Sequence, residues 1–217
     1  FIWIDWPGYC VFLMSELPSL RQPPEWHTQE AVFTAWPAHR EYWDEHLEPA
    51  RREFAAFCRA LAREGTEEQP FLHLWVDGEK NLEVASELLE GVPVVYHRET
   101  YGDIWFRDTG PVFVHSEAGE CYAVRFQFNG WGGKYIMRDD ATVASRLSGY
   151  TGFESIEVPL VFEGGSLDVD GLGNALTTRQ CLLNPNRNPG ISEESLCWHL
   201  RYALGVEHLI WLEEGLG

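Results

Sequence analysis

Short apolar runs alternate with amphipathic stretches along the chain, and this alternation predicts a mixed α/β fold. The apolar runs end at Pro, Gly or Asp-Gly, as is typical of buried strands. Between several runs, apolar residues recur three and four positions apart, which indicates one face of a helix. The predicted strands are 31–36, 71–76, 92–96, 111–115, 121–128, 156–162, 166–169, 174–178 and 208–212, and the predicted helices are 49–65, 82–91, 141–149 and 192–205.

The order of these elements repeats along the chain. Two strands joined by a hairpin, then a helix and a third strand, follow one another over 111–162, and the same order returns over 166–212. The segment 31–96 has a looser version of this strand-strand-helix-strand order. Units that cannot bury their own faces must stack or form a ring, so the repeat predicts a propeller-like α/β fold. Three such units do not close a ring, and we therefore expect an incomplete domain.

Composition and charge narrow the choice of partner. The chain has 217 residues, 45% of them apolar, which is typical of one large globular domain or two small ones. The formal net charge of −18 argues against nucleic acid or an anionic membrane as partner and permits a cationic substrate, although simple solubility explains most of the charge. Five scattered cysteines without a CxxC pair argue against a zinc site and favour a reducing cytoplasm over secretion.

The first thirteen residues differ in character from the rest. Residues 1–13 are apolar and aromatic but contain Asp5 and Pro7. The stretch lacks the basic start of a signal peptide and is too short to span a membrane. Because Met14 begins a sequence typical of a natural start, we expect 1–13 to be a non-native extension.

The stretch from Tyr101 to Pro111 concentrates the candidate chemistry, with two acids, an arginine and a tryptophan before a Gly-Pro break. If the chain turns between Trp105 and Asp108, the indole can cover a flat cation while the carboxylate accepts two of its N–H groups. From local chemistry alone a simpler alternative is favoured. In that alternative Arg107 pairs with Asp108 at a strand end, and Trp105 belongs to the core.

Two glycine-containing loops and one cysteine add to the candidates. The segment 128–134 lacks the spacing of a phosphate-binding loop, and we interpret it as a tight loop with close backbone approach. Glu163 stands at a strand end before two glycines that leave room for a ligand, and a solvated glutamate in a turn is an equally good interpretation. Cys181 lies among apolar residues with no histidine close in sequence, so we interpret it as a buried structural cysteine, not a nucleophile.

Four motifs taken together resemble the agmatine deiminase family. This family belongs to the guanidine-modifying, or pentein, superfamily, which also includes the bacterial-type peptidylarginine deiminases. The motifs are WFRDTGP at 105–111, FNGWGGKY at 128–135, EGGS at 163–166 and CLLNPNRNP at 181–189. The resemblance runs from about Glu25 to the end of the chain. It implies that 14–217 form the N-terminal portion of a deiminase catalytic domain.

The resemblance also implies a fold and a mechanism. The fold is a five-bladed α/β propeller with the substrate at its axis, of which about three units would be present. A cysteine thiolate attacks the guanidinium carbon and a histidine moves protons, with no metal and no organic cofactor. Asp108 would be a catalytic residue as one of the acids that grip the guanidinium nitrogens, Trp105 would wall the site, and Glu163 would be a further acidic contact. The family's His-x-Asp motif and nucleophilic cysteine are expected beyond Gly217, so we expect this chain alone to be inactive.

Three functions stay open at this point. The first is a cytoplasmic agmatine deiminase that makes N-carbamoylputrescine and ammonia, a step in putrescine biosynthesis and polyamine metabolism. The second has the same chemistry with arginine or peptidylarginine as substrate, and the third is a non-catalytic guanidinium-binding module. The expected partner is a small cationic guanidinium compound, with no role for nucleic acid or membrane. The sequence does not decide the oligomeric state, and a homo-oligomer is allowed.

Overall fold

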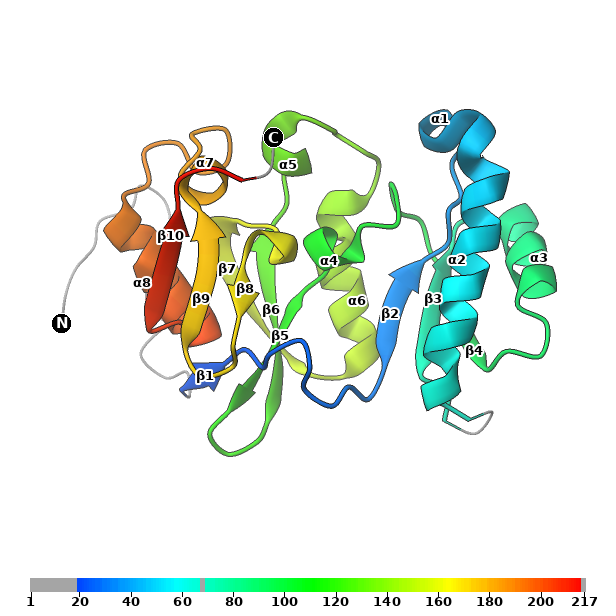
Figure 1. The fold of residues 1–217 in the computed structure, drawn as a ribbon, viewed down its shortest axis with the longest axis horizontal. Helices are drawn as coiled ribbons and strands as arrows, with labels where there is room; N and C mark the ends of the chain where they lie inside the picture. The colour runs from blue at the N-terminus through cyan, green and yellow to red at the C-terminus, as the bar shows by residue number, and fades with distance from the viewer. Residues whose placement is uncertain (1–18, 67–68, 216–217) are drawn as a thin grey trace.

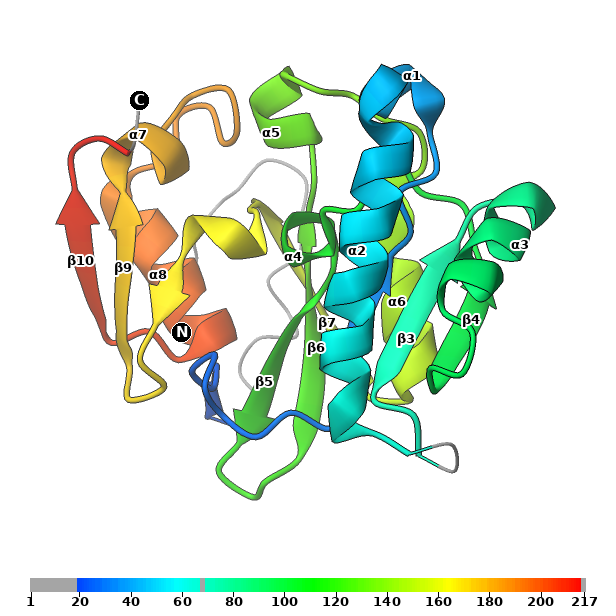
Figure 2. The same cartoon turned by 45° about the vertical axis from the view of Figure 1, so that its right-hand side comes forward.

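The computed structural model describes residues 19–66 and 69–215, so the predicted extension at 1–13 lies outside the described residues. Three β-sheets alternate with helical layers along the long axis of the molecule (Figure 1). Each sheet has its own strand order, and helices from neighbouring units fill the space between sheets (Figure 2). The mixed α/β fold that the sequence predicts is therefore confirmed.

The first sheet is entirely parallel, in the order β2-β3-β4. Helices α2 and α3 cover one of its faces, because alternate residues of β3 such as Leu72 and Leu74 are fully buried against them. This unit has no hairpin, and its main helix begins at Leu47, not at the expected Pro49. The elements are β2 (Val32–Ala35), α1 (Arg40–Trp43), η1 (Asp44–His46), α2 (Leu47–Leu61), η2 (Ala62–Glu64), β3 (Leu72–Val76), α3 (Glu79–Leu88) and β4 (Val94–Arg98).

The second sheet is mixed, because the β5–β6 hairpin is antiparallel and β7 joins β6 in parallel. Helix α6 makes that crossover and packs with Trp75 and Tyr101 in the core between the first two sheets. It ends at Gly152, which adopts φ 70°, and not at the expected Gly149. The elements are β1 (Leu20–Arg21), α4 (Phe106–Thr109), β5 (Val112–Ser116), β6 (Cys121–Gln127), α5 (Gly130–Gly133), η3 (Asp140–Thr142), α6 (Val143–Thr151) and β7 (Glu154–Val161).

The third sheet repeats the order of the second, with an antiparallel β8–β9 hairpin and β10 parallel to β9. Helix α8 lies between the second and third sheets, where Leu196 and Leu200 are fully buried. Its boundaries follow the prediction: Oγ of Ser192 accepts a hydrogen bond from the N–H of Ser195, and Gly205 ends the helix. The elements are η4 (Gly164–Ser166), β8 (Asp168–Val169), β9 (Asn174–Thr178), α7 (Arg179–Leu182), α8 (Glu193–Leu204) and β10 (His208–Leu212).

The topology brings four short segments together. The chain leaves β6 into α5, β7 into η4 and β9 into α7, so all three segments follow the carboxyl end of a strand. Segment α4 precedes β5, and the antiparallel hairpin places it at the same edge as the end of β6. Loops at this edge are where α/β folds commonly bind ligands.

Among residues 19–66 and 69–215, no helix is both long enough and apolar enough to cross a membrane.

Candidate active site

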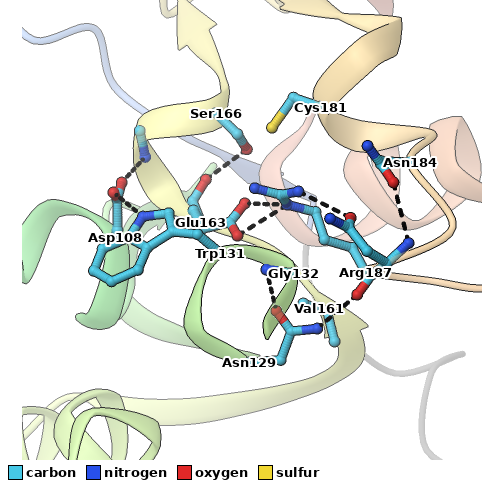
Figure 3. A network of polar contacts seen from close by, with 12 residues as sticks. Asp108, Asn129, Trp131, Gly132, Val161, Glu163, Ser166, Cys181, Asn184 and Arg187 are labelled. Carbon is cyan, nitrogen blue, oxygen red and sulfur yellow. Dashed lines mark hydrogen bonds and ion pairs between the residues drawn. The ribbon is translucent and has the colours of Figure 1, made fainter. Parts of the chain in front are cut away.

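Asp108 is held from two loops by hydrogen bonds to both of its oxygens. Oδ2 accepts from Nε1 of Trp131 at 2.8 Å, and Oδ1 accepts from the backbone N–H of Gly165 at 2.9 Å (Figure 3). A Cβ at Gly165 would lie 2.3 Å from Oδ1, so this approach requires glycine. Arg107 points elsewhere and pairs with Glu25. The alternative of an Arg107–Asp108 pair is therefore wrong, because the carboxylate takes its partners from distant loops.

Glu163 is buried and paired with an arginine. Its side chain is 3% exposed, and both carboxylate oxygens lie 2.9 Å from Nε of Arg187. Burying a carboxylate this deeply has a large desolvation cost, which two neutral hydrogen bonds would not compensate and an ion pair with arginine does. The interpretation of Glu163 as a solvated turn residue is therefore wrong. Sequence reasoning missed Arg187, although it is the one cation in the stretch 181–189.

The glycine-rich loop aims Trp131 at Asp108 through an unusual backbone conformation. Trp131 has φ 55° and ψ 50°, in the left-handed region where a bulky residue is strained. The loop is braced by Asn129, whose Oδ1 accepts from Gly132 N at 2.8 Å and whose Nδ2 donates to the carbonyl of Asn186 at 3.0 Å. A Cβ at Gly132 would lie 2.2 Å from the Asn186 side chain. The expected close backbone approach is confirmed, and its result is the orientation of an indole.

Cys181 lies at the edge of this network and is only partly buried. Cys181 lies in helix α7, where its N–H donates to Oγ1 of Thr178 at 3.1 Å, and its sulfur points toward the Glu163–Arg187 pair (Figure 3). Burial raises the pKa of the thiol, Arg187 lowers it, and the charges of Glu163 and Asp108 raise it further. The thiol is therefore neutral near pH 7. Its position at the site corrects the expectation of a cysteine enclosed in the core.

Trp105 is 49% exposed, so the alternative that assigns it to the core is wrong. It directly precedes α4, and its carbonyl accepts the N–H of Asp108 at 3.0 Å. Its indole Nε1 donates to Oδ2 of Asp103 at 3.0 Å, a bond made by the ring edge and not by its faces. One helical turn thus presents an exposed aromatic face and an anchored carboxylate.

The arrangement suits a flat, delocalised cation. Each carboxylate oxygen can accept two hydrogen bonds, and each oxygen of Asp108 uses one within the protein. The remaining capacity can accept N–H groups from a ligand. Asp108 is connected to Glu163 because Gly165, which donates to Asp108, lies in the same 163–166 segment. It is connected to Arg187 through the Trp131 loop, where Asn129 bonds to Asn186. Trp105 is connected to this network through the backbone, because its carbonyl accepts the N–H of Asp108, whereas its indole bonds to Asp103.

Solved structures with the same fold come from deiminases. The agmatine deiminase of Enterococcus faecalis matches with a TM-score of 0.81 at 30% sequence identity, over 91% of this chain and 54% of that chain. A C. jejuni agmatine deiminase with substrate bound matches with a TM-score of 0.79 at 28% identity, over 91% of this chain and 57% of that chain. The fold is therefore the mixed α/β fold of this class of protein.

Sequence comparison gives the family. The model of the Porphyromonas-type peptidyl-arginine deiminase family matches residues 21–217, and the chain belongs to that family. A Pectobacterium atrosepticum protein that is provisionally named an agmatine deiminase is 36% identical over 204 residues, which are 89% of this chain and 52% of the relative. The chain thus spans about half the length of the curated relatives it matches. The resemblance seen in the four motifs is confirmed at the level of the family.

Proposed function

We propose that the protein is an agmatine deiminase, which hydrolyses the guanidinium of agmatine to give N-carbamoylputrescine and ammonia. The observation that carries the proposal is Asp108, whose two oxygens are fixed by Trp131 and Gly165 in the same turn that exposes the indole of Trp105. Relatives and structural neighbours named as agmatine deiminases support it. The acidic balance of the chain, −18, agrees with a cationic substrate.

In this proposal Asp108 holds two guanidinium N–H groups while Trp105 covers the ligand plane. Fixing the plane also fixes the direction from which a nucleophile reaches the central carbon, which is the main contribution of a binding residue to rate. Glu163 is the further acidic contact of this proposal, and Arg187 compensates its charge and keeps the carboxylate in place. The acids therefore stabilise the positive charge of the substrate and set its geometry.

The covalent step in this proposal uses a cysteine that is not among residues 19–215. A thiolate adds to the guanidinium carbon, ammonia leaves with a proton supplied by a histidine, and water then releases the ureido product from the sulfur. Cys181 does not suit this role because burial raises the pKa of its thiol. No histidine of the described residues hydrogen-bonds to Asp108 or Glu163. No metal or organic cofactor is assigned a step.

The same proposal includes a five-bladed propeller with the site at its axis. Two units share the strand-strand-helix-strand order, and helices cover both faces of the second sheet. The outer face of the third sheet instead exposes Leu176, Ile210 and Leu212, so a further layer is expected to cover it. We place the enzyme in the cytoplasm, in putrescine biosynthesis.

An ammonia assay with three substrates tests the proposal. The protein, purified as its gene encodes it, is given agmatine, free arginine or a blocked arginine peptide. Ammonia from agmatine above the other two supports the proposed function, because Arg187, the cation of the described network, is already paired with Glu163 and is not free to bind an α-carboxylate. Preference for arginine or for the peptide would make it an arginine or peptidylarginine deiminase. Ammonia from none, with calorimetric binding of agmatine retained, would leave only a guanidinium-binding module.

A further inference from the structure

A second buried carboxylate lies next to the candidate site, and the proposed mechanism does not use it. Asp103 is 6% exposed, and each of its oxygens accepts a hydrogen bond from a different indole. Nε1 of Trp43 donates to Oδ1 at 2.9 Å, and Nε1 of Trp105 donates to Oδ2 at 3.0 Å. Trp43 ends helix α1, 60 positions before Asp103. One carboxylate therefore connects α1 to the aromatic wall of the site.

The two indoles stand in different surroundings. Trp43 is partly buried, whereas Trp105 is 49% exposed. A half-exposed tryptophan has more than one rotamer open to it unless a polar contact selects one. The hydrogen bond from Nε1 of Trp105 to Asp103 restricts both of its side-chain torsions. The plane that would face a ligand is therefore set by Asp103.

The backbone of Asp103 is fixed by another buried acid. The N–H of Gly102 donates to Oδ1 of Asp140 at 2.7 Å. A Cβ at Gly102 would lie 2.7 Å from both oxygens of Asp140 and 2.4 Å from Cβ of Met137, so this close packing requires glycine. Asp140 is 2% exposed, and burial raises the pKa of its carboxyl group. Asp103 thus projects its carboxylate from a rigid support.

The carboxylate also changes the electronic character of the indole it holds. A hydrogen bond to an anion draws the N–H proton toward the oxygen and leaves more electron density over the ring. A cation above that ring is then attracted more strongly, whereas a neutral molecule of the same shape is little affected. Orientation and polarisation act in the same direction for a guanidinium ligand.

We propose that Asp103 is a positioning residue for the cationic ligand and that it acts through Trp105. This role differs from that of Asp108, which contacts the ligand itself. For the identity of the cation the inference rests on the proposed function. The competing explanation is structural: Asp103 serves only to tie α1 to the loop through Trp43.

A double-mutant cycle on the protein as its gene encodes it separates the two explanations. Asp103→Asn retains the size but removes the charge and leaves one acceptor oxygen for two indole donors. We expect it to raise KM for agmatine about tenfold while kcat changes less than about threefold. In a Trp105→Phe background the same change should leave KM unaltered, because the partner is gone. An equal rise in KM in both backgrounds would overturn the proposal.

Trp43→Phe is the matched control, because it removes the other indole donor and leaves the Asp103–Trp105 contact in place. We expect a lower melting temperature and a KM within about twofold of the wild type. A rise in KM as large as that of Asp103→Asn would show that the link to α1 carries the effect, and would overturn the proposal. If Asp103→Asn does not fold, Asp103→Glu replaces it in the cycle, because glutamate retains the charge but displaces it. We again expect Asp103→Glu to raise KM in the wild type and not in the Trp105→Phe background.

A spectroscopic test does not depend on agmatine being the substrate. The protein is labelled with 5-fluorotryptophan, and the ¹⁹F resonance of Trp105 is assigned from its loss in Trp105→Phe. Methylguanidinium should shift this resonance in the wild type and much less in Asp103→Asn, while neutral methylurea should shift it in neither. Equal shifts in the two proteins, or no shift in the wild type, would overturn the proposal. Absence of ammonia from agmatine alongside the expected shifts would overturn only the proposed function.

Discussion

Nε1 of Trp131 donates a 2.8 Å hydrogen bond to Oδ2 of Asp108 from a backbone conformation, φ 55°, that a tryptophan rarely adopts. The glycines on either side of Trp131 adopt the same conformation at no steric cost, but the tryptophan does not. Backbone strain of this kind persists where the surrounding structure over-determines it, and it is concentrated at functional sites. The strain here has a visible result, which is a carboxylate fixed in one orientation.

Asp108→Asn tests whether that orientation serves a ligand. Trp131 and Gly165 each donate to one oxygen of Asp108, so the NH2 group of an asparagine would face one of these two donors. The asparagine also lacks the charge that pairs with a guanidinium. We expect a loss of roughly 3 kcal/mol of transition-state stabilisation, about a hundredfold in kcat/KM. The variant is to be compared with the wild type in kcat/KM and in melting temperature. A stable variant with unchanged kinetics would remove Asp108 from the site.

Glu163→Gln should affect stability more than activity. Its charge compensates Arg187, whose side chain is 11% exposed, so the neutral variant leaves a buried cation without its partner. We expect a loss of about 3 kcal/mol in the free energy of unfolding. The decrease in kcat/KM should be smaller than for Asp108→Asn, because Glu163 is only one of several acids proposed to contact the substrate. Urea unfolding and steady-state kinetics measure the two effects. Arg187→Met added to Glu163→Gln should recover part of the stability.

The exposed pair Arg98–Glu79 is a control for Glu163, because its side chains are 69% and 61% exposed. Glu79→Gln should change the free energy of unfolding by less than about 1 kcal/mol. If Glu163→Gln were as mild as this control, Glu163 would not be a buried partner of Arg187 in solution.

The sequence predicted those parts of the fold that local chemistry determines. Strand β10 occupies 208–212 as predicted, and the ends of α8 follow from the hydroxyl of Ser192 and the positive φ of Gly205. Helices α1 and α4 were missed because one turn is too short to show a hydrophobic period. In the first unit the predicted helices do connect the predicted strands, and such connections give the parallel pairing that β2, β3 and β4 show.

The sequence predicted some residues of the candidate site but not the residues that bond to them. Asp108, Trp105 and Glu163 stood in motifs with suggestive chemistry, but their partners come from other loops. Asp108 meets a residue 57 positions away, and the nearest cation in sequence, Arg107, pairs elsewhere. Spacing does not reveal such contacts, since they depend on how the units pack. A usable signal existed for Glu163, because a buried acid requires a cation and the motif at 181–189 contains a single arginine.

The pair of His73 and His97 predicts a loss of stability in mild acid. Nδ1 of His73 lies 3.0 Å from Nε2 of His97, a contact that needs at least one neutral ring. Burial lowers the pKa of both, and the neighbouring ring lowers that of His97 further, while Glu99 raises it. A folded pKa below the unfolded value of 6.5 means that the unfolded state takes up protons first as the pH falls.

Stability from this pair is therefore present above pH 6.5 and decreases as the pH falls through that value. Tyr150 and Phe33 pack against the two rings, and Arg146 approaches Glu99, so an added positive charge has little room. We expect melting temperature to decline with pH less steeply in His73→Phe than in the wild type. His46→Gln, at an exposed position, should leave the slope unchanged. Equal slopes in all three proteins would show that the pair does not titrate on unfolding.

Cys181→Ser asks whether the thiol at the edge of the site takes part in the chemistry. Burial and the charges of Glu163 and Asp108 raise the pKa of Cys181, and the single opposing charge is that of Arg187, which Glu163 already pairs. A neutral thiol is a poor nucleophile, so the serine variant should retain kcat/KM within about threefold. For the same reason, residues 1–217 purified alone should release no ammonia from agmatine. Turnover by purified residues 1–217 that Cys181→Ser abolishes would make Cys181 the nucleophile and would contradict the assignment of the covalent step to another cysteine.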